Sequence, residues 1–155
     1  MWWEGLPDMS TGRFGSAAIN IPELGVLVLG GQGVDAEELN TVELFQISAE
    51  NSVWCSFTPM LKTIYRPVVD FFQGCVYVVG SQFSHPQTAE FLSITNGRQG
   101  QWTLISKSLS TRRYLSSMLA FSDHLYIVAE GGNVYELETS HEENVSAITS
   151  HSILN

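Results

Sequence analysis

The sequence predicts an all-β fold of about three repeated units, each made of four short strands. An apolar run rich in β-branched residues occurs three times, at positions 26–31, 76–81 and 125–130. Gly30 and Gly80, the glycines near the ends of the first two runs, lie 50 positions apart, and Ala129 follows 49 positions later. No window of useful length shows helical periodicity. A fixed period near fifty residues indicates a repeat array rather than one irregular domain.

Other residues keep the same period. Trp3, Trp54 and Trp102 lie 51 and 48 positions apart, and Met9 and Met60 each follow their tryptophan by six. An arginine comes before each apolar run, as Arg13, Arg66 and the pair Arg112–Arg113. After each run comes one of the equivalent pairs Val42–Glu43, Ala89–Glu90 and Val134–Tyr135. Because several independent markers share the period, the repeat does not depend on one motif.

Each period accommodates four strands separated by turn-forming residues. The strands expected in the first period are 15–21, 25–29, 41–47 and 53–58. In the second period they are 67–72, 75–80, 88–94 and 101–105, and in the third 115–121, 124–129, 133–137 and 145–149. The second strand of each period is continuously apolar, as expected for a strand that is buried on both faces.

Four strands in about fifty residues is the size of a β-propeller blade. The glycines would let the chain leave a crowded strand through a tight turn, and the tryptophan of the fourth strand would pack between neighbouring blades. A sandwich whose strands recur by coincidence is the alternative, and the shared spacing disfavours it. The predicted boundaries are the end of a preceding blade over 1–8, blades over 9–58, 59–107 and 108–150, the last of them degenerate, and a tail over 151–155.

These markers resemble the kelch repeat, which runs Met, Arg, an apolar strand, a second strand ending in Gly-Gly, Val-Glu with a following aromatic residue, and Trp. The first copy matches at Met9, Arg13, Gly30–Gly31, Val42–Glu43, Phe45 and Trp54. The second keeps Met60, Arg66, Gly80, Glu90 and Trp102 but has Ser81 for the second glycine. The third has Ala129–Glu130 at this place, with Gly131–Gly132 two positions later. The resemblance covers the whole chain and implies a partial kelch β-propeller.

Kelch propellers usually close with about six blades. Here the sequence supplies three units, with Trp2–Trp3 as the end of an earlier strand. Because three blades leave sheet edges open, a fragment of a longer protein is favoured over a shortened product or a ring completed by another chain. The connection between the second and third strands shortens from copy to copy. Variable loops on one rim of a regular scaffold are where binding specificity lies.

The charge balance argues against nucleic acid as a partner. Seven Lys and Arg stand against 16 Asp and Glu, for a net charge of −9, which repels phosphate backbones. The two cysteines, Cys55 and Cys75, show no disulfide-framework or metal spacing, as expected in a reducing compartment. No stretch is long and apolar enough for a membrane span, and the first residues lack the regions of a signal peptide. The expectation is a cytoplasmic protein without membrane contact.

No catalytic, metal-binding or cofactor-binding motif stands out, and no cofactor is expected. The four histidines share no metal-ligand spacing, and His141 lacks the second histidine of a zinc-binding helix. Gly30, Gly31 and Gly33 are followed by neither a Lys-Ser/Thr pair nor a helix, so phosphate binding is rejected. A non-enzymatic role is therefore predicted.

The arginines are the best candidates for binding. Arg13, Arg66 and Arg113 precede the first strand of their units, so propeller symmetry would gather them around one opening. Guanidinium groups on an acidic chain suit the carboxylates of a partner peptide. The alternative is that each arginine holds the turn between blades by donating to loop carbonyls. Arg112 competes with Arg113 as the third member, and three neighbouring aromatic residues would add flat contact surface: Phe14, Tyr65 and Tyr114.

The kelch resemblance implies where such a surface acts. In kelch substrate receptors the corresponding arginine lies on the face that grips acidic degron peptides. The predicted function is therefore a non-catalytic module that binds a protein or acidic peptide through its rim loops. By resemblance, the complete protein would be a substrate adaptor of a cullin ubiquitin ligase, with a BTB domain upstream. Binding of actin or another cytoskeletal protein, and membership of the kelch-type oxidases or isomerases, are the alternatives.

Overall fold

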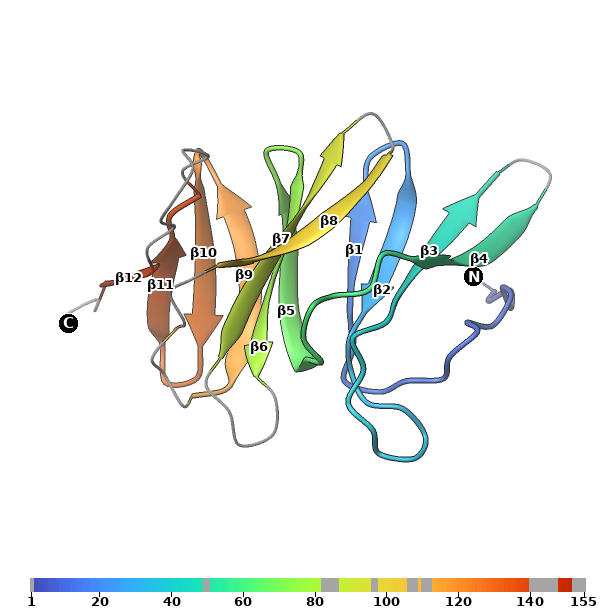
Figure 1. Ribbon diagram of the computed structural model, residues 1–155, viewed down its shortest axis with the longest axis horizontal. Coiled ribbons are helices and arrows are strands. Elements are labelled where there is room, and N and C mark those ends of the chain that lie inside the picture. Colours follow the sequence, from blue (N-terminus) through green and yellow to red (C-terminus); the bar gives the residue numbers. More distant parts are fainter. Residues whose placement is uncertain are drawn as a thin grey trace.

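The computed structural model describes residues 2–48, 51–81, 87–95, 98–105, 109, 113–139 and 148–151, and places strands but no helix among them. The strands form three antiparallel sheets of four (Figure 1). The first sheet contains β1 (Ala17–Ile21), β2 (Gly25–Leu29), β3 (Val42–Ile47) and β4 (Ser52–Phe57). The second contains β5 (Tyr65–Phe72), β6 (Cys75–Ser81), β7 (Thr88–Thr95) and β8 (Arg98–Ile105). The third contains β9 (Leu115–Phe121), β10 (His124–Ala129), β11 (Asn133–Leu137) and β12 (Ile148–His151).

The prediction of an all-β fold is confirmed, and each expected strand overlaps an observed one. Within every sheet each strand pairs with its neighbours in the sequence. The largest shift is at the last strand, which was expected over 145–149 and is observed over Ile148–His151. Residues 2–8 form no strand, in contrast to the prediction that they end one. In the described part of the chain, their backbone has no neighbouring strand with which to pair.

Glycine is required where the chain leaves β2. Gly30 and Gly31 have φ angles of 63° and 90°, in the left-handed region that favours glycine. A Cβ on Gly30 would also lie 2.6 Å from the carbonyl oxygen of Ile64. Gly80, at the same place in the second sheet, meets the side chain of Ile64 instead. Both glycines therefore let the linker between the first and second sheets, which contains Ile64, approach the end of a second strand closely.

Neighbouring sheets pack face to face, and they do so in the same way twice. β1 contacts β5, and β5 contacts β9, so the first strands of the three sheets lie side by side (Figure 1). We name as the forward face of each sheet the one that carries alternate residues of its second strand: Leu27 and Leu29, Tyr77 and Val79, or Tyr126 and Val128. The rear face carries the intervening residues: Val26 and Val28, Val76 and Val78, or Leu125 and Ile127. The forward face of one sheet packs on the rear face of the next.

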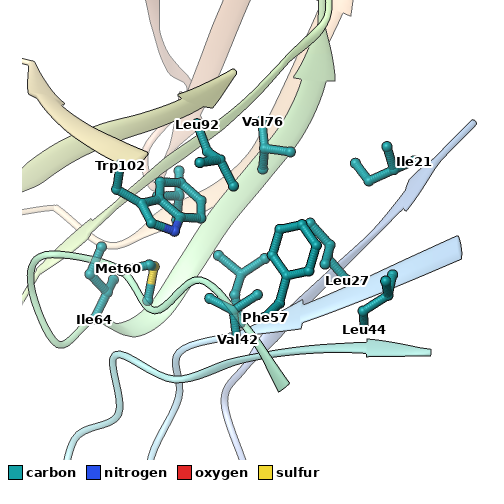
Figure 2. Packing of buried hydrophobic residues seen from close by; sticks show 12 residues of the cluster. Ile21, Leu27, Val42, Leu44, Phe57, Met60, Ile64, Val76, Leu92 and Trp102 are labelled. Atoms are coloured by element: carbon teal, nitrogen blue, oxygen red, sulfur yellow. The ribbon is translucent and has the colours of Figure 1, made fainter. Parts of the chain in front are cut away.

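Trp102 fills the space between the first two sheets. Figure 2 shows its indole beside Met60 and Ile64 of the linker, with Leu92 and Phe57 close by. The side chain is 4% exposed, and its Nε1–H donates to the carbonyl of Thr58 at 2.8 Å. The prediction that a fourth-strand tryptophan packs between neighbouring units is confirmed for this residue. The equivalent Trp54 is half-buried and donates to the carbonyl of Pro7 at the same distance, 2.8 Å.

Candidate partner-binding site

The predicted binding residues lie at or just before the starts of β1, β5 and β9. These starts lie at one edge of the molecule, the lower edge in Figure 1, together with the β2–β3 connection. The strands begin there because all three run in the same direction beside one another. This edge, where three units meet, is the candidate site.

Three aromatic residues occupy equivalent backbone positions at this edge. Phe14 exchanges two backbone hydrogen bonds with Gln32, at 3.0 and 2.9 Å, and Tyr65 pairs with Ser81. The carbonyl of Tyr114 accepts a hydrogen bond of 2.9 Å from the backbone N–H of Glu130. Each aromatic residue is therefore held opposite a residue at or shortly after the end of the second strand of its sheet. The three aromatic residues, which the sequence placed only beside the arginines, are therefore equivalent in the structure.

Arg66 joins these aromatic side chains into one row. Its guanidinium carbon lies 5.3 Å from the ring centre of Tyr65 and 6.0 Å from that of Tyr114, within the range of cation–π attraction. The rings of Tyr65 and Phe14 meet edge to face, with their centres 6.3 Å apart. We name these four residues, Phe14, Tyr65, Arg66 and Tyr114, the aromatic–arginine row. The row spans all three sheets.

The Arg66 guanidinium is open to a partner. The residue is exposed, and among the described residues no carboxylate forms an ion pair with it. Phe14 and Tyr114 are also exposed, by 52% and 62%. An exposed cation flanked by flat apolar rings offers both charge and contact area to a partner.

Arg66 holds a backbone conformation that disfavours arginine. Its φ angle is 49°, and its counterpart in the first sheet, Gly15, has a φ of 63°. The N–H of Arg66 donates to the carbonyl of Gly15 at 3.0 Å, which fixes this geometry. A left-handed conformation costs a non-glycine residue roughly 1–2 kcal/mol. Glycine would fit without this cost, so the backbone conformation itself does not favour arginine at this position.

The prediction that Arg13 offers a free guanidinium is wrong for this structure. Its side chain is fully buried, and its Nη2 lies 2.6 Å from Oε1 of Glu43. Nη1 donates to the carbonyls of Gly30 and Thr41 at 3.2 and 3.0 Å. The guanidinium therefore holds the turn after β2 and neutralises a buried carboxylate, in line with the structural alternative.

The predicted equivalence of Arg13 and Arg66 is also wrong. Because Phe14 matches Tyr65, the counterpart of Arg13 in the second sheet is Ile64, a fully buried residue. Counting from the preceding methionine gives the same answer, since Arg13 follows Met9 by four positions and Ile64 follows Met60 by four. The three arginines therefore form no ring of equivalent cations.

Arg113 is the third-sheet counterpart of Arg13. It directly precedes Tyr114, and its Nη1 donates to the carbonyl of Glu130 at 3.3 Å, in the turn after β10. Its glutamate is missing, because Tyr135 stands where Glu43 and Glu90 stand in the other sheets. This placement assigns Arg113 as the motif arginine. Arg112 lies outside the described residues.

A buried glutamate clamps the linker of each of the first two units. Glu43 accepts hydrogen bonds from the backbone N–H groups of Ser10 and Thr11, at 2.9 and 3.1 Å. Glu90 accepts from Leu61 and Lys62, each at 2.8 Å. These glutamates stood out in the sequence as repeat markers, but this contact was not predicted. Its signal was the recurrence of a glutamate in the first two units, at Glu43 and Glu90.

The two clamps differ in electrostatics because only one has an arginine. Burial raises the pKa of Glu43, but the hydrogen bonds from Arg13 and Ser10 outweigh burial, so the pKa is lowered overall. Burial also raises the pKa of Glu90, and here the backbone N–H bonds do not compensate, so the pKa stays raised. Ile64 stands where the first unit has Arg13. The charge of Lys62 lowers the pKa of Glu90 too little to offset burial.

We expect Glu90→Gln and Glu43→Gln to change stability with opposite pH trends. A raised pKa means that the folded state binds more protons, so the wild-type contribution of Glu90 falls as pH rises from the ordinary glutamate range through its folded pKa. A lowered pKa means the reverse, so the contribution of Glu43 is present at neutral pH and lost on acidification. Urea unfolding between about pH 4 and 7 measures both differences from wild type. Parallel trends in the two variants would contradict the assigned pKa directions.

Gln87 is a residue at this edge that sequence reasoning missed. It is 5% exposed, and its Nε2 donates to the carbonyl of Arg113 at 2.8 Å, which ties the start of β7 to the approach to β9. Its Oε1 and the hydroxyl of Thr88 have no hydrogen-bond partner among the residues that the structure describes. No repeat marker coincides with Gln87, so no pattern in the sequence could single it out.

The described residues contain no group of three or more His, Cys, Asp or Glu that could hold a metal ion. Cys55 and Cys75 are free thiols. His85 and His141 lie outside the described residues. No helix that could cross a membrane occurs in the part of the chain described.

Comparison with known proteins gives a likeness of fold alone. No protein-family model and no curated protein matches the chain. A solved structure described as "Structure of YjhT" matches 92% of this chain with a TM-score of 0.63 and 13% sequence identity. The match covers 46% of that protein, so this chain spans about half of its length. The arrangement of three successive four-stranded sheets is therefore one that also occurs within a larger solved chain.

Proposed function

We propose that the three sheets are blades of a kelch-type β-propeller and that this module binds a partner protein through the aromatic–arginine row. The side-by-side contacts of β1, β5 and β9 and the repeated forward-to-rear packing support the propeller arrangement. The repeat markers found in the sequence support the kelch assignment. The likeness to part of a larger solved chain is consistent with a ring of more than three such blades.

One observation carries the binding function. The exposed Arg66 guanidinium lies between two tyrosine rings, on a backbone that would be less strained with glycine. Strained backbone positions cluster at functional sites. Cations and aromatic side chains are the residues that contribute most to protein interfaces.

The partner chemistry that fits the row is a short acidic peptide segment with an apolar or aromatic neighbour. A carboxylate would pair with Arg66, and the neighbouring side chain would pack on Phe14 or Tyr114. Acidic residues of the β2–β3 connection, Asp35 and Glu37, are exposed on the first-sheet side. They would repel additional carboxylates there and so restrict the acidic group of the partner to the surroundings of Arg66.

We expect Arg66→Gly to abolish most binding while leaving the fold intact. The probe is an array of peptides that each carry one Asp or Glu beside an aromatic residue, followed by fluorescence anisotropy on the strongest binder. Loss of a charge-assisted pair is worth roughly 1.5–3 kcal/mol, so affinity should fall about tenfold or more. Because glycine accepts the positive φ, the free energy of unfolding should stay within about 1 kcal/mol of wild type.

Lys62→Gly is the matched control, since it also removes an exposed cation but lies outside the row. It should leave peptide affinity unchanged within twofold, because an exposed charge that makes no direct contact with the peptide contributes little to binding. Binding that survives Arg66→Gly, or that falls equally in both variants, would refute the proposed site. Absence of any binder on the array would refute the acidic-peptide class.

In the complete protein, the proposed module would select substrates for a cullin ubiquitin ligase. Actin is the alternative partner, and cosedimentation of the chain with actin filaments tests this alternative. Pelleting that is insensitive to Arg66→Gly would move the binding surface away from the row.

A further inference from the structure

The forward face of the third sheet carries large apolar side chains with nothing packed on them among the described residues. Phe121 and Leu119, from β9, are 69% and 41% exposed. Tyr126 and Val128, on β10, are half-buried. These four residues lie on one face, because Leu119 pairs with Tyr126 in the β9–β10 register and side chains alternate along each strand.

The same positions are buried in the other two sheets. The counterparts of Phe121 are Ile21 and Phe72, which are 1% and 7% exposed, and those of Val128 are Leu29 and Val79, both fully buried. In those sheets the next sheet covers the forward face. These apolar positions of the third sheet are therefore the ones that a neighbouring sheet covers in the other two. The paired His124 and Glu136 lie beside them on the same face.

The chain also carries the complementary surface. The rear face of the first sheet presents Ala18 and Asn20 of β1, both exposed, beside Val26 and Val28 of β2. The linker crosses this face, held by Glu43 and by the Trp54 indole, as the second linker crosses the rear face of the second sheet. The third sheet thus presents an uncovered forward face, and the first sheet presents a rear face that its own linker already crosses.

We propose that the open forward face of the third sheet is covered by a second copy of this chain. The second copy would contact it through the rear face of its own first sheet. The two faces differ, so the contact is heterologous and repeats until it closes. Two chains joined through two such contacts make a ring of six sheets, within the range of about four to eight that propellers use. The matched solved chain agrees in size, since this chain covers 46% of it. This inference is independent of what binds at Arg66.

The existing seams predict which residues would meet. Between the second and third sheets, Asp70 on a forward face accepts a hydrogen bond from the backbone N–H of Ala120 on a rear face, at 2.5 Å. By the repeat registers, Asp70 corresponds to Leu119 and Ala120 corresponds to Asn20. Leu119 of one copy should therefore lie beside Asn20 of the other.

The first test is the mass of the full chain in solution by light scattering and sedimentation over a range of concentrations. We expect a species of twice the 17.2 kDa chain mass. Phe121→Glu should weaken dimerisation at least about tenfold, because it places a charge in an apolar contact. Val34→Glu is the matched control, since Val34 is 84% exposed on the β2–β3 connection, away from the forward face. A monomer at every concentration, or equal weakening by both variants, would overturn the proposal.

The second test is covalent and does not depend on the strength of association. The double variant Leu119→Cys with Asn20→Cys is oxidised, and the products are separated under denaturing conditions. Within one chain the second sheet separates these positions, so a disulfide forms only between copies. A covalent dimer supports the closed ring. A ladder of longer polymers would mean that the contact does not close, and an uncrosslinked chain would mean that these faces do not meet. Each variant that carries only one of the two introduced cysteines should remain uncrosslinked.

Discussion

Trp102→Ala is expected to lower the free energy of unfolding by about 3–5 kcal/mol, the range for removing a fully buried large aromatic side chain. The indole is 4% exposed and lies within the cluster that joins the first two sheets (Figure 2). Its removal leaves a cavity beside Met60 and Leu92 and removes the indole hydrogen bond to the carbonyl of Thr58. Urea unfolding followed by circular dichroism measures the change.

Trp54→Ala serves as the matched comparison for this result. Trp54 has the same place in its sheet and donates in the same way to Pro7, but it is only half-buried and has no sheet on its outer side in the described chain. The cost should therefore be clearly smaller, about 1–2 kcal/mol. Equal costs at the two positions would show that burial between sheets is not the source of the stabilisation.

Arg13→Ile is expected to lower the free energy of unfolding by about 3 kcal/mol at neutral pH, because it leaves the buried carboxylate of Glu43 without its cation. The second sheet already shows this arrangement, with Ile64 in place of the arginine. The variant should therefore raise the pKa of Glu43, as burial does for Glu90. It also removes the donors to Gly30 and Thr41.

The pH dependence distinguishes loss of charge pairing from loss of packing. In wild type the pKa of Glu43 is lowered, so its contribution is present above the ordinary glutamate pKa and lost on acidification. In the variant a raised pKa would make stability fall as pH rises. The difference between the two proteins should therefore be largest at neutral pH and shrink towards pH 4. A difference that is constant with pH would contradict the electrostatic account.

Arg113→Ile is the control for the same change of side chain. Arg113 is exposed and donates to the carbonyl of Glu130, and the position of its glutamate is taken by Tyr135. Because no buried carboxylate loses its partner, the cost should stay below about 1 kcal/mol. The contrast between Arg13 and Arg113 isolates the contribution of the buried ion pair.

The strands were predictable because their signals are local and repeated. The apolar runs that became β2, β6 and β10 combine β-branched residues with glycine or turn residues at their ends. The positions of the third strands β3 and β7 could be predicted because Glu43 and Glu90 recur at the repeat period. Residues 2–8 were the exception, because a strand exists only where another strand is available to pair with it.

The candidate site was predictable in part. Phe14, Tyr65 and Tyr114 followed the period and became neighbours at one edge. The equivalence of Arg13 and Arg66 was predicted wrongly. It was inferred because each arginine precedes the first strand of its unit, whereas the distance from the preceding methionine matches Arg13 with Ile64. Two positions separate the locations of Arg13 and Arg66 in their units, and a shift of this size decides whether a guanidinium is enclosed by the turn or exposed between rings.

The glutamate clamps also bear on how the chain acquires its structure. Ser10 and Glu43 are 33 residues apart, and Leu61 and Glu90 are 29 apart, so each clamp closes a loop within one unit. Contacts that lie within one unit need nothing from later parts of the chain. During synthesis the first unit can therefore be complete before the second has left the ribosome. Each finished unit then presents a formed apolar surface on which its successor condenses, so that assembly proceeds from the N-terminus in steps of one unit.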